Sequence, residues 1–245
     1  MDPLKLYLHL EDQQSDRYRI ALRRVCGVTV IEDLAVADAV VSKDERCVIN
    51  KPMLWIEGDS PAPRESVVPA MPWRFRPSVL VMSERLRSGK LGVPGLLRVH
   101  RWRADADLLA DIDLALWLFS GEPETVFAMA RDGYRQAHLG FSGGGMVIVD
   151  HATNLPSGGY ESVTLIGSKG AAYADDHRNV NLRLVATGCE GITTGEGDVA
   201  LANMLNDFVT SVREDRQGAV TMSDFEKAAR VRDRVLESTS KEAVV

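Results

Sequence analysis

The stretch from residue 108 to residue 123 constrains the fold of this 245-residue chain more than any other. Its apolar side chains recur at three- and four-residue spacing, at Leu109, Ile112, Leu116 and Trp117. Gly121 and Pro123 then provide the usual helix stop. The spacing predicts a helix with one strongly apolar face. We expect this helix to be buried where the two halves of the chain meet.

The N-terminal half alternates between short strand and helix patterns. Residues 4–10 alternate apolar and polar side chains and predict a strand, and a helix is expected over about 15–25. Short strands are predicted at 28–31 and 39–41. Strand, helix and strand in this order favour a parallel β-α-β unit. Residues 57–72 are rich in turn-forming residues, and we expect them to connect the two halves.

The turn between the first strand and the first helix lacks the glycines of a dinucleotide-binding unit. Residues 11–16 are Glu-Asp-Gln-Gln-Ser-Asp, and the first glycine of the chain is Gly27. Glycines in this turn allow the backbone to approach a pyrophosphate at the helix N-terminus. Three carboxylates there would repel a diphosphate, whereas they suit the helix dipole. The turn therefore predicts helix-capping carboxylates rather than a nucleotide site.

The C-terminal half is rich in strand patterns. Candidate strands lie at residues 95–103, 125–131, 134–141, 146–151, 160–167, 171–174 and 181–185. Hairpin-type connections between several of them predict a mostly antiparallel sheet with helices on one side. We expect the glycine-rich residues 188–197 to form a mobile surface loop. Two amphipathic helices close the chain, and Ser223 with Glu226 predicts a capping box at the start of the second.

Four stretches carry motifs that occur together in one known family. Residues 73–77 are Trp-Arg-Phe-Arg-Pro, residues 167–175 are Gly-Ser-Lys-Gly-Ala-Ala-Tyr-Ala-Asp, and residues 50–52 are Asn-Lys-Pro. In the helical stretch, Asp113, Leu114 and Trp117 fit the frame Asp-x-Gly-x-His-x-x-Asp-Leu followed by Trp-Leu. With these motifs the chain resembles the glucose–fructose oxidoreductase and inositol dehydrogenase family, Gfo/Idh/MocA. The resemblance covers residues 73–240 well and 28–52 in fragments.

The resemblance implies an α+β fold with two domains. Residues 1–72 would form a reduced, truncated Rossmann-like α/β unit. Residues 73–245 would form a mostly antiparallel open β-sheet domain with helices on one face, similar to the C-terminal domain of dihydrodipicolinate reductase. In the family, a Rossmann domain binds NAD(P), and the open sheet forms the floor of the substrate pocket and often a dimer or tetramer interface.

The chain departs from the family where the chemistry takes place. Ala110 stands in place of the family's catalytic His, and Ala106 in place of its Asp. Lys51 is the one conventional active-site residue that the comparison retains, and it is our candidate catalytic residue. Three further side chains are candidates for a substrate pocket: Asp113, Asp111 and Arg74.

Composition excludes several other classes of function. A formal net charge of −6 argues against binding to nucleic acid or to an anionic membrane surface. No apolar window is long enough to span a bilayer, so we expect a soluble, cytoplasmic protein. Three widely spaced cysteines and five histidines show no metal-ligand spacing, so no metal site is predicted.

Three functional hypotheses remain. The first is a degenerate, non-catalytic relative that associates with itself as a homodimer or higher oligomer through the C-terminal sheet, or with a full-length homologue, and that retains a sugar-like ligand. No cofactor is expected in that case. The second is an NAD(P)-dependent oxidoreductase of a sugar- or cyclitol-like substrate with a remodelled cofactor site and Lys51 as its remaining polar group. The third is an unrelated lyase or isomerase activity that uses Lys51 and a carboxylate.

Overall fold

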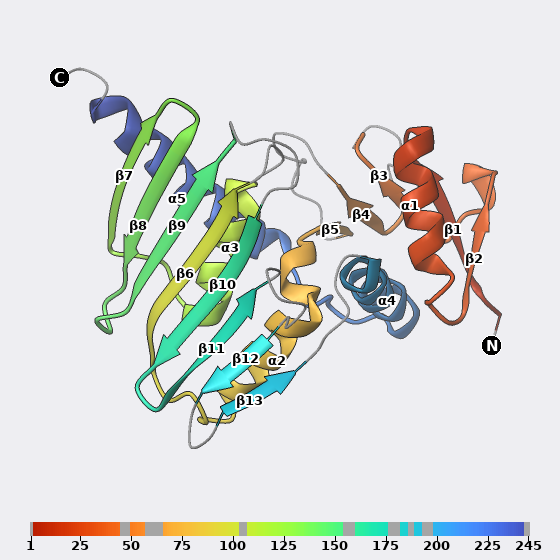
Figure 1. Ribbon diagram of the computed structural model, residues 1–245. Coiled ribbons are helices and arrows are strands. Elements are labelled where there is room, and N and C mark those ends of the chain that lie inside the picture. The colour runs from red at the N-terminus through yellow and green to blue at the C-terminus, as the bar shows by residue number, and fades with distance from the viewer. Residues whose placement is uncertain are drawn as a thin grey trace. The chain divides into compact units, whose positions relative to one another are not determined.

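The structure is a computed structural model that describes residues 2–44, 50–56, 66–102, 107–153, 160–175, 182–185, 189–192 and 198–242 (Figure 1). The chain divides into two compact units, Met1–Arg76 with Gly197–Phe225 and Pro77–Glu196 with Glu226–Val245. The boundary predicted at residue 72 assigned residues 197–225 to the second domain, and the structure places them with the first. Amphipathicity alone cannot show which sheet or helix an apolar helix face will contact, which accounts for the difference.

The first unit contains a five-stranded parallel sheet in the order β2-β1-β3-β4-β5. The strands are β1 Leu4–His9, β2 Val28–Ile31, β3 Ala39–Ser42, β4 Met53–Trp55 and β5 Val67–Pro69. All residues of β3 and β4 are buried, as expected for parallel strands that are covered on both faces. Strand β5 and the start of η3 lie within the predicted connection 57–72, of which residues 57–65 are outside the described residues.

The helices of the first unit are α1 Asp12–Leu22, η1 Leu34–Val36, η3 Pro72–Phe75, α4 Asp198–Glu214 and the first turn of α5 Met222–Glu242. Helix α1 begins three residues before the expected position, inside the acidic stretch 11–16. Helix α4 packs against α1 and η3 and buries Leu205, Phe208 and Val209. Gly27 has a φ of +70°, in the left-handed region that glycine tolerates best, and it lies under the Arg213 side chain of α4.

The second unit contains an eight-stranded sheet in the order β13-β12-β11-β10-β6-β9-β8-β7. Its elements are α2 Pro77–Arg87, β6 Pro94–Trp102, α3 Leu108–Phe119, β7 Thr125–Arg131, β8 Tyr134–Gly140, β9 Met146–Ala152, β10 Tyr160–Gly167, β11 Gly170–Asp175, β12 Leu182–Val185, β13 Cys189–Ile192 and the rest of α5. Only the β6–β9 pair is parallel among the described strands of this sheet. Residues 189–192 form a strand where we expected a loop, because pairing with β12 supplies their backbone partners.

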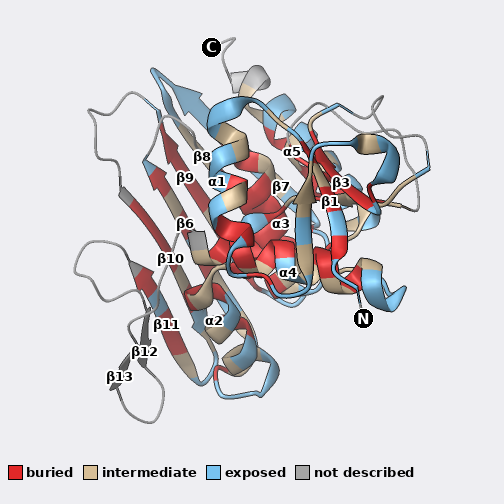
Figure 2. Ribbon diagram, turned by 90° about the vertical axis from the view of Figure 1, so that its right-hand side faces the viewer, coloured by how far each residue is buried: buried red, intermediate tan, exposed pale blue. Residues whose placement is uncertain are grey.

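Helices α2, α3 and α5 lie on one face of this sheet (Figure 1). The expected burial of α3 is confirmed, and it extends beyond a single apolar face: of its twelve residues only Leu109, Trp117 and Phe119 are not fully buried. The middle strands of the sheet also carry buried residues, between residues that are more exposed (Figure 2). Their side chains alternate, with Leu97, Val99 and equivalent residues packed under the helices. The opposite face carries no described helix of this unit, and we call it the open face.

These two units confirm the expected fold class, a Rossmann-like parallel unit combined with a mixed, mostly antiparallel sheet domain. None of the helices within the described ranges is long and apolar enough to cross a membrane.

Candidate functional site

The carboxyl ends of β1 and β3 form the place where an open parallel sheet usually binds its ligand. Strand β1 leads through α1 to β2 on one side, whereas β3 lies on the other side of β1. Ligands of such sheets bind where the strand order reverses in this way. The chain therefore retains the topology of a nucleotide-binding unit.

The side chains at this edge do not fit a diphosphate. Only Leu10 and Glu11 separate β1 from α1, with Glu11 as the N-cap and Asp12 in the first turn. Lys43, which follows β3, has its Nζ 3.7 Å from Glu11 Oε1. Lys43 is thus paired with a carboxylate at the start of the helix. None of the described residues in this turn has a positive φ, so the backbone lacks the glycine conformation that admits a pyrophosphate.

Glu32 follows β2 directly, at the end of the second strand, and the sequence analysis did not single it out. Dinucleotide-binding folds place an acidic residue about 20 residues after the glycine turn, where it binds a ribose hydroxyl. Glu32 Oε1 is 2.9 Å from Arg19 Nη2 of α1. The signal that could have identified it is its position immediately after a predicted strand.

Lys51 is held by backbone carbonyl groups. Its Nζ donates to the oxygens of Leu34 at 2.9 Å, Ala35 at 3.1 Å and Ala37 at 2.5 Å. A lysine ammonium has three N–H groups, so these bonds use all of its donors. In this structure Lys51 satisfies the carbonyl end of η1, and a substrate hydroxyl would have to replace one of these bonds.

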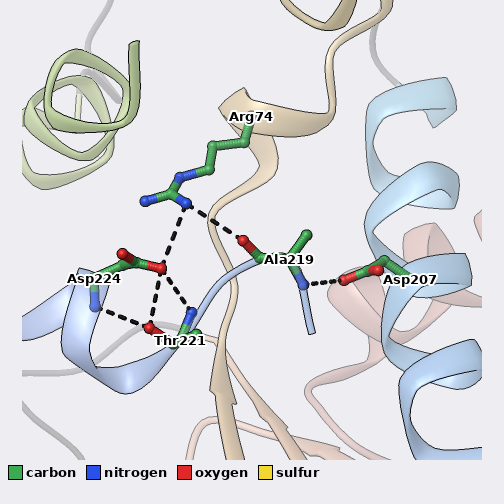
Figure 3. Close-up of polar contacts among 5 residues, drawn as sticks. All are labelled: Arg74, Asp207, Ala219, Thr221 and Asp224. Atoms are coloured by element: carbon green, nitrogen blue, oxygen red, sulfur yellow. Dashed lines mark hydrogen bonds and ion pairs between the residues drawn. The ribbon is translucent and has the colours of Figure 1, made fainter. Parts of the chain in front are cut away.

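Arg74, on η3, is buried and contacts the start of α5 (Figure 3). Its Nη1 is 3.4 Å from the Ala219 carbonyl oxygen and 3.5 Å from Asp224 Oδ2. Asp224 Oδ2 in turn accepts the Thr221 backbone N–H at 3.1 Å, and Thr221 Oγ1 accepts the Asp224 N–H at 3.2 Å. The contacts of Arg74 therefore support the helix start.

These reciprocal bonds form a capping box between Thr221 and Asp224. The sequence analysis predicted the box at Ser223 and Glu226, two residues later, and that prediction was wrong. Both pairs have the spacing of a capping box, so local sequence permits either. Arg74 favours the earlier pair, because its guanidinium is near the carboxylate that closes the box.

Asp111 lies in a buried cluster of charged side chains between α3 and the sheet. Arg101 Nε is 3.1 Å from Asp111 Oδ1, and His151 Nε2 is 2.8 Å from Asp111 Oδ2. Glu161 Oε2 is 4.0 Å from Arg101 Nη1. Three adjacent strands place these groups at one level, since Arg101 on β6 pairs in register with His151 on β9 and Glu161 on β10.

The sequence analysis named Asp111 but not Arg101, His151 or Glu161 as site residues. The available signal was alternation: Arg101 falls on the same face of its strand as Leu97 and Val99, both of which are buried. Asp113 is also fully buried on α3. The structure therefore places Asp111 and Asp113 together on one core helix, while Arg74 and Lys51 belong to the other unit.

The N-terminal part of α3 carries alanine where the family pattern has histidine. Ala110 is buried, and Asp107 is the N-cap, with its Oδ1 accepting the Leu109 N–H at 2.9 Å. Ala106 lies outside the described residues. Among the described residues, no group of three or more His, Cys, Asp or Glu side chains is placed to hold a metal ion.

The open face has polar residues at its centre. Asp150 of β9 accepts hydrogen bonds from Arg98 Nε at 3.1 Å and from Gln136 Nε2. Gln136 Oε1 is 2.9 Å from His138 Nε2. His100 Nδ1 is 3.5 Å from Asp150 Oδ2. We call these five residues the polar chain. Burial lowers the pKa of His100 below its usual value, the Arg98 charge lowers it further, and Asp150 partly opposes both.

Large apolar side chains surround the polar chain. They are Trp102, Phe127, Met129, Tyr134, Met146, Ile166 and Tyr173, each between 37% and 52% exposed. The strand registers place all seven on the same side of the sheet as the polar chain. Single exposed apolar residues are common, whereas a contiguous set of this size usually marks an interaction surface.

No protein-family model and no curated protein matches the sequence. Solved structures do share its fold. A levoglucosan dehydrogenase in complex with NADH and L-sorbose is 13% identical, with a TM-score of 0.81, and the match covers 99% of this chain and 98% of that chain. A myo-inositol dehydrogenase from Corynebacterium glutamicum is 15% identical, with a TM-score of 0.79 and coverage of 98% and 97%.

An oxidoreductase from Agrobacterium radiobacter in complex with NAD+, L-tartaric acid and magnesium is 13% identical, with a TM-score of 0.79 and coverage of 97% and 96%. The fold is therefore that of Gfo/Idh/MocA-type dehydrogenases, as the sequence motifs predicted.

Proposed function

We propose that this chain is a non-catalytic member of this fold group that serves as an assembly subunit, with the open face as the contact between two copies. The observation that carries the proposal is the combination of seven large, half-exposed apolar side chains with an almost neutral centre. Loss of NAD(P) binding and of hydride transfer is part of the proposal.

The cofactor edge supports the loss of nucleotide binding. Glu11 and Asp12 occupy the helix start that would face a pyrophosphate, and Lys43 is paired with Glu11. Hydride transfer would also lack its usual polar side chains. Ala110 stands where the family has a histidine, and the N–H groups of Lys51 are bonded to backbone carbonyl groups. The residues at this edge do not fit NAD(P).

A second copy is the occupant that the charge pattern favours. In a two-fold symmetric dimer the same patch meets itself, so any net charge near the axis repels its own image. In the polar chain the one arginine, Arg98, is paired with the one carboxylate, Asp150. Six adjacent strands carry the patch, and strands about 4.8 Å apart span about 24 Å, a width suited to the roughly 800 Å² per partner of a stable interface.

One observation favours a different function, an NAD(P)-dependent oxidoreductase of a sugar- or cyclitol-like substrate. Glu32 stands where such folds place the carboxylate that binds a ribose. For this function, Glu32 would have to release Arg19 and bind a ribose hydroxyl instead. The phosphate groups would also have to bind somewhere other than the start of α1. Two further alternatives are a full-length homologue as partner, which the mass measurement tests, and a retained sugar-like ligand.

Calorimetric titration of the chain with NADH and with NADPH tests the proposed loss of nucleotide binding. Light scattering tests the proposed association between copies. We expect no binding heat and the mass of a dimer or larger oligomer. Phe127→Arg should reduce that mass to one chain, because the new cation would be buried against its symmetry mate. Ile20→Arg is the matched control: Ile20 is 48% exposed, on α1, whereas Phe127 is 46% exposed.

Micromolar binding of either nucleotide, abolished by Glu32→Ala, would replace the proposal with the oxidoreductase. A monomer at high concentration that captures a full-length homologue through the open face would replace only the identity of the partner.

A further inference from the structure

The two histidines of the polar chain lie in the part of the open face that an interface between copies would exclude most completely from water. His138 belongs to β8 and His100 to β6, and both point to the open face with Asp150 between them. Histidine is the side chain whose charge changes between pH 5 and 8. The charge of the centre therefore changes when these histidines take up protons.

We propose that His100 and His138 make the association of two copies through the open face pH-dependent, with the dimer weakened in acid. The inference rests on the proposed function, since it concerns the same surface. With both histidines neutral, the polar chain carries one positive and one negative charge, those of Arg98 and Asp150. Protonation of both imidazoles would give each copy a net charge of about +2 at its centre.

The charged groups around each imidazole determine whether its protonation weakens or strengthens the dimer. His100 is close to Arg98 and Arg101 on its own strand and to Asp150 on β9, and Ser162 of β10 pairs with it in register. His138 is bounded by Gln136, by Phe127 of β7 at 6.1 Å between ring centroids, and by Ile148 of β9. Asp150, which Arg98 already neutralises, is the single described carboxylate among these neighbours.

Burial against a second copy makes protonation less favourable. A cation that loses water without gaining a partner is destabilised, and in a symmetric contact the protonated centre also faces its own image. Protons that are disfavoured in the dimer bind on dissociation. The dissociation constant should therefore rise by up to tenfold per pH unit for each histidine that takes up a proton.

Sedimentation equilibrium from pH 7.5 to pH 5.5 measures this dependence, with far-UV circular dichroism at each pH to verify that the chain stays folded. We expect the wild-type dissociation constant to rise at least about tenfold over this range. The double variant H100Q/H138Q should dimerise with a constant that changes less than about threefold. H9Q is the control, because His9 lies on β1 of the other unit.

A calorimetric dilution experiment needs no variant. The heat of dissociation near pH 6.5, measured in phosphate and in Tris, gives the number of protons taken up because the ionisation enthalpies of the two buffers differ. We expect a clear uptake of protons per dimer. A dimer that dissociates without proton uptake, or a double variant as acid-sensitive as the wild type, would overturn the inference and leave the proposed function standing. A monomer at every pH would overturn the proposed function itself.

Discussion

Arg101 of β6 and Asp111 of α3 form an ion pair of 3.1 Å inside the core, where the two side chains are 1% and 0% exposed. The pair joins the sheet to the helix for which the sequence predicted a strongly apolar face. His151 bonds the second oxygen of the same carboxylate. A carboxylate in such a place is tolerable only while its partners remain, because an isolated buried charge is strongly unfavourable.

Replacing Arg101 with Met should lower the free energy of unfolding by about 3–5 kcal/mol, because Asp111 and Glu161 would remain buried without the guanidinium. Urea unfolding followed by circular dichroism measures the change. Arg230→Met is the control: its pair with Glu122 is exposed and should contribute less than about 1 kcal/mol. Equal losses in the two variants would contradict a core role for the cluster. R101M/D111L should unfold at higher urea than R101M.

Thr221→Ala should destabilise the start of α5 by about 0.5–2 kcal/mol, since it removes the hydroxyl that accepts the Asp224 N–H. Ser223→Ala, at the position that the sequence analysis favoured, should change the free energy of unfolding by less than about 0.5 kcal/mol because Ser223 is exposed. Urea midpoints of the two variants provide the comparison. A larger loss for Ser223→Ala would return the capping box to its predicted position.

Lys51→Met tests whether Lys51 is structural. The variant leaves three carbonyl groups without their ammonium donor, and we expect the free energy of unfolding to fall by about 1–3 kcal/mol. Lys90→Met serves as the control, because Lys90 is exposed in the turn before β6. Unchanged stability together with loss of a ligand-binding or catalytic property would instead support Lys51 as a functional residue.

Stability should fall as the pH is lowered from 7.5 toward 5.5, and His100 should account for part of the fall. Burial keeps the pKa of His100 below 6.5 in the folded chain, so the unfolded chain binds the proton more readily. The stability is fully present above pH 6.5 and is lost as the pH falls toward the folded pKa. Urea midpoints, measured at concentrations where copies do not associate, should vary less with pH in His100→Gln. An equal slope in both proteins would exclude this contribution.

Local sequence predicted most elements of the fold. The alternation in residues 4–10 and the spacing in α3 correspond to observed elements, because such periods reflect which side of one element is apolar. Local sequence predicted a loop at the residues of β13. This four-residue edge strand forms only through its hydrogen bonds with β12, which local sequence does not show. The capping box was misplaced for a similar reason, as the deciding group, Arg74, is remote in sequence.

The candidate site was predicted only in part. The glycine-free turn after β1 and Ala110 on α3 can be read directly from the sequence. The tertiary structure alone decided three other features. They are the contact of Arg101 and His151 with Asp111, the carbonyl groups around Lys51, and the polar chain of the open face. Each depends on the register between strands that are distant in sequence, and a one-residue change in register would turn every side chain to the other face.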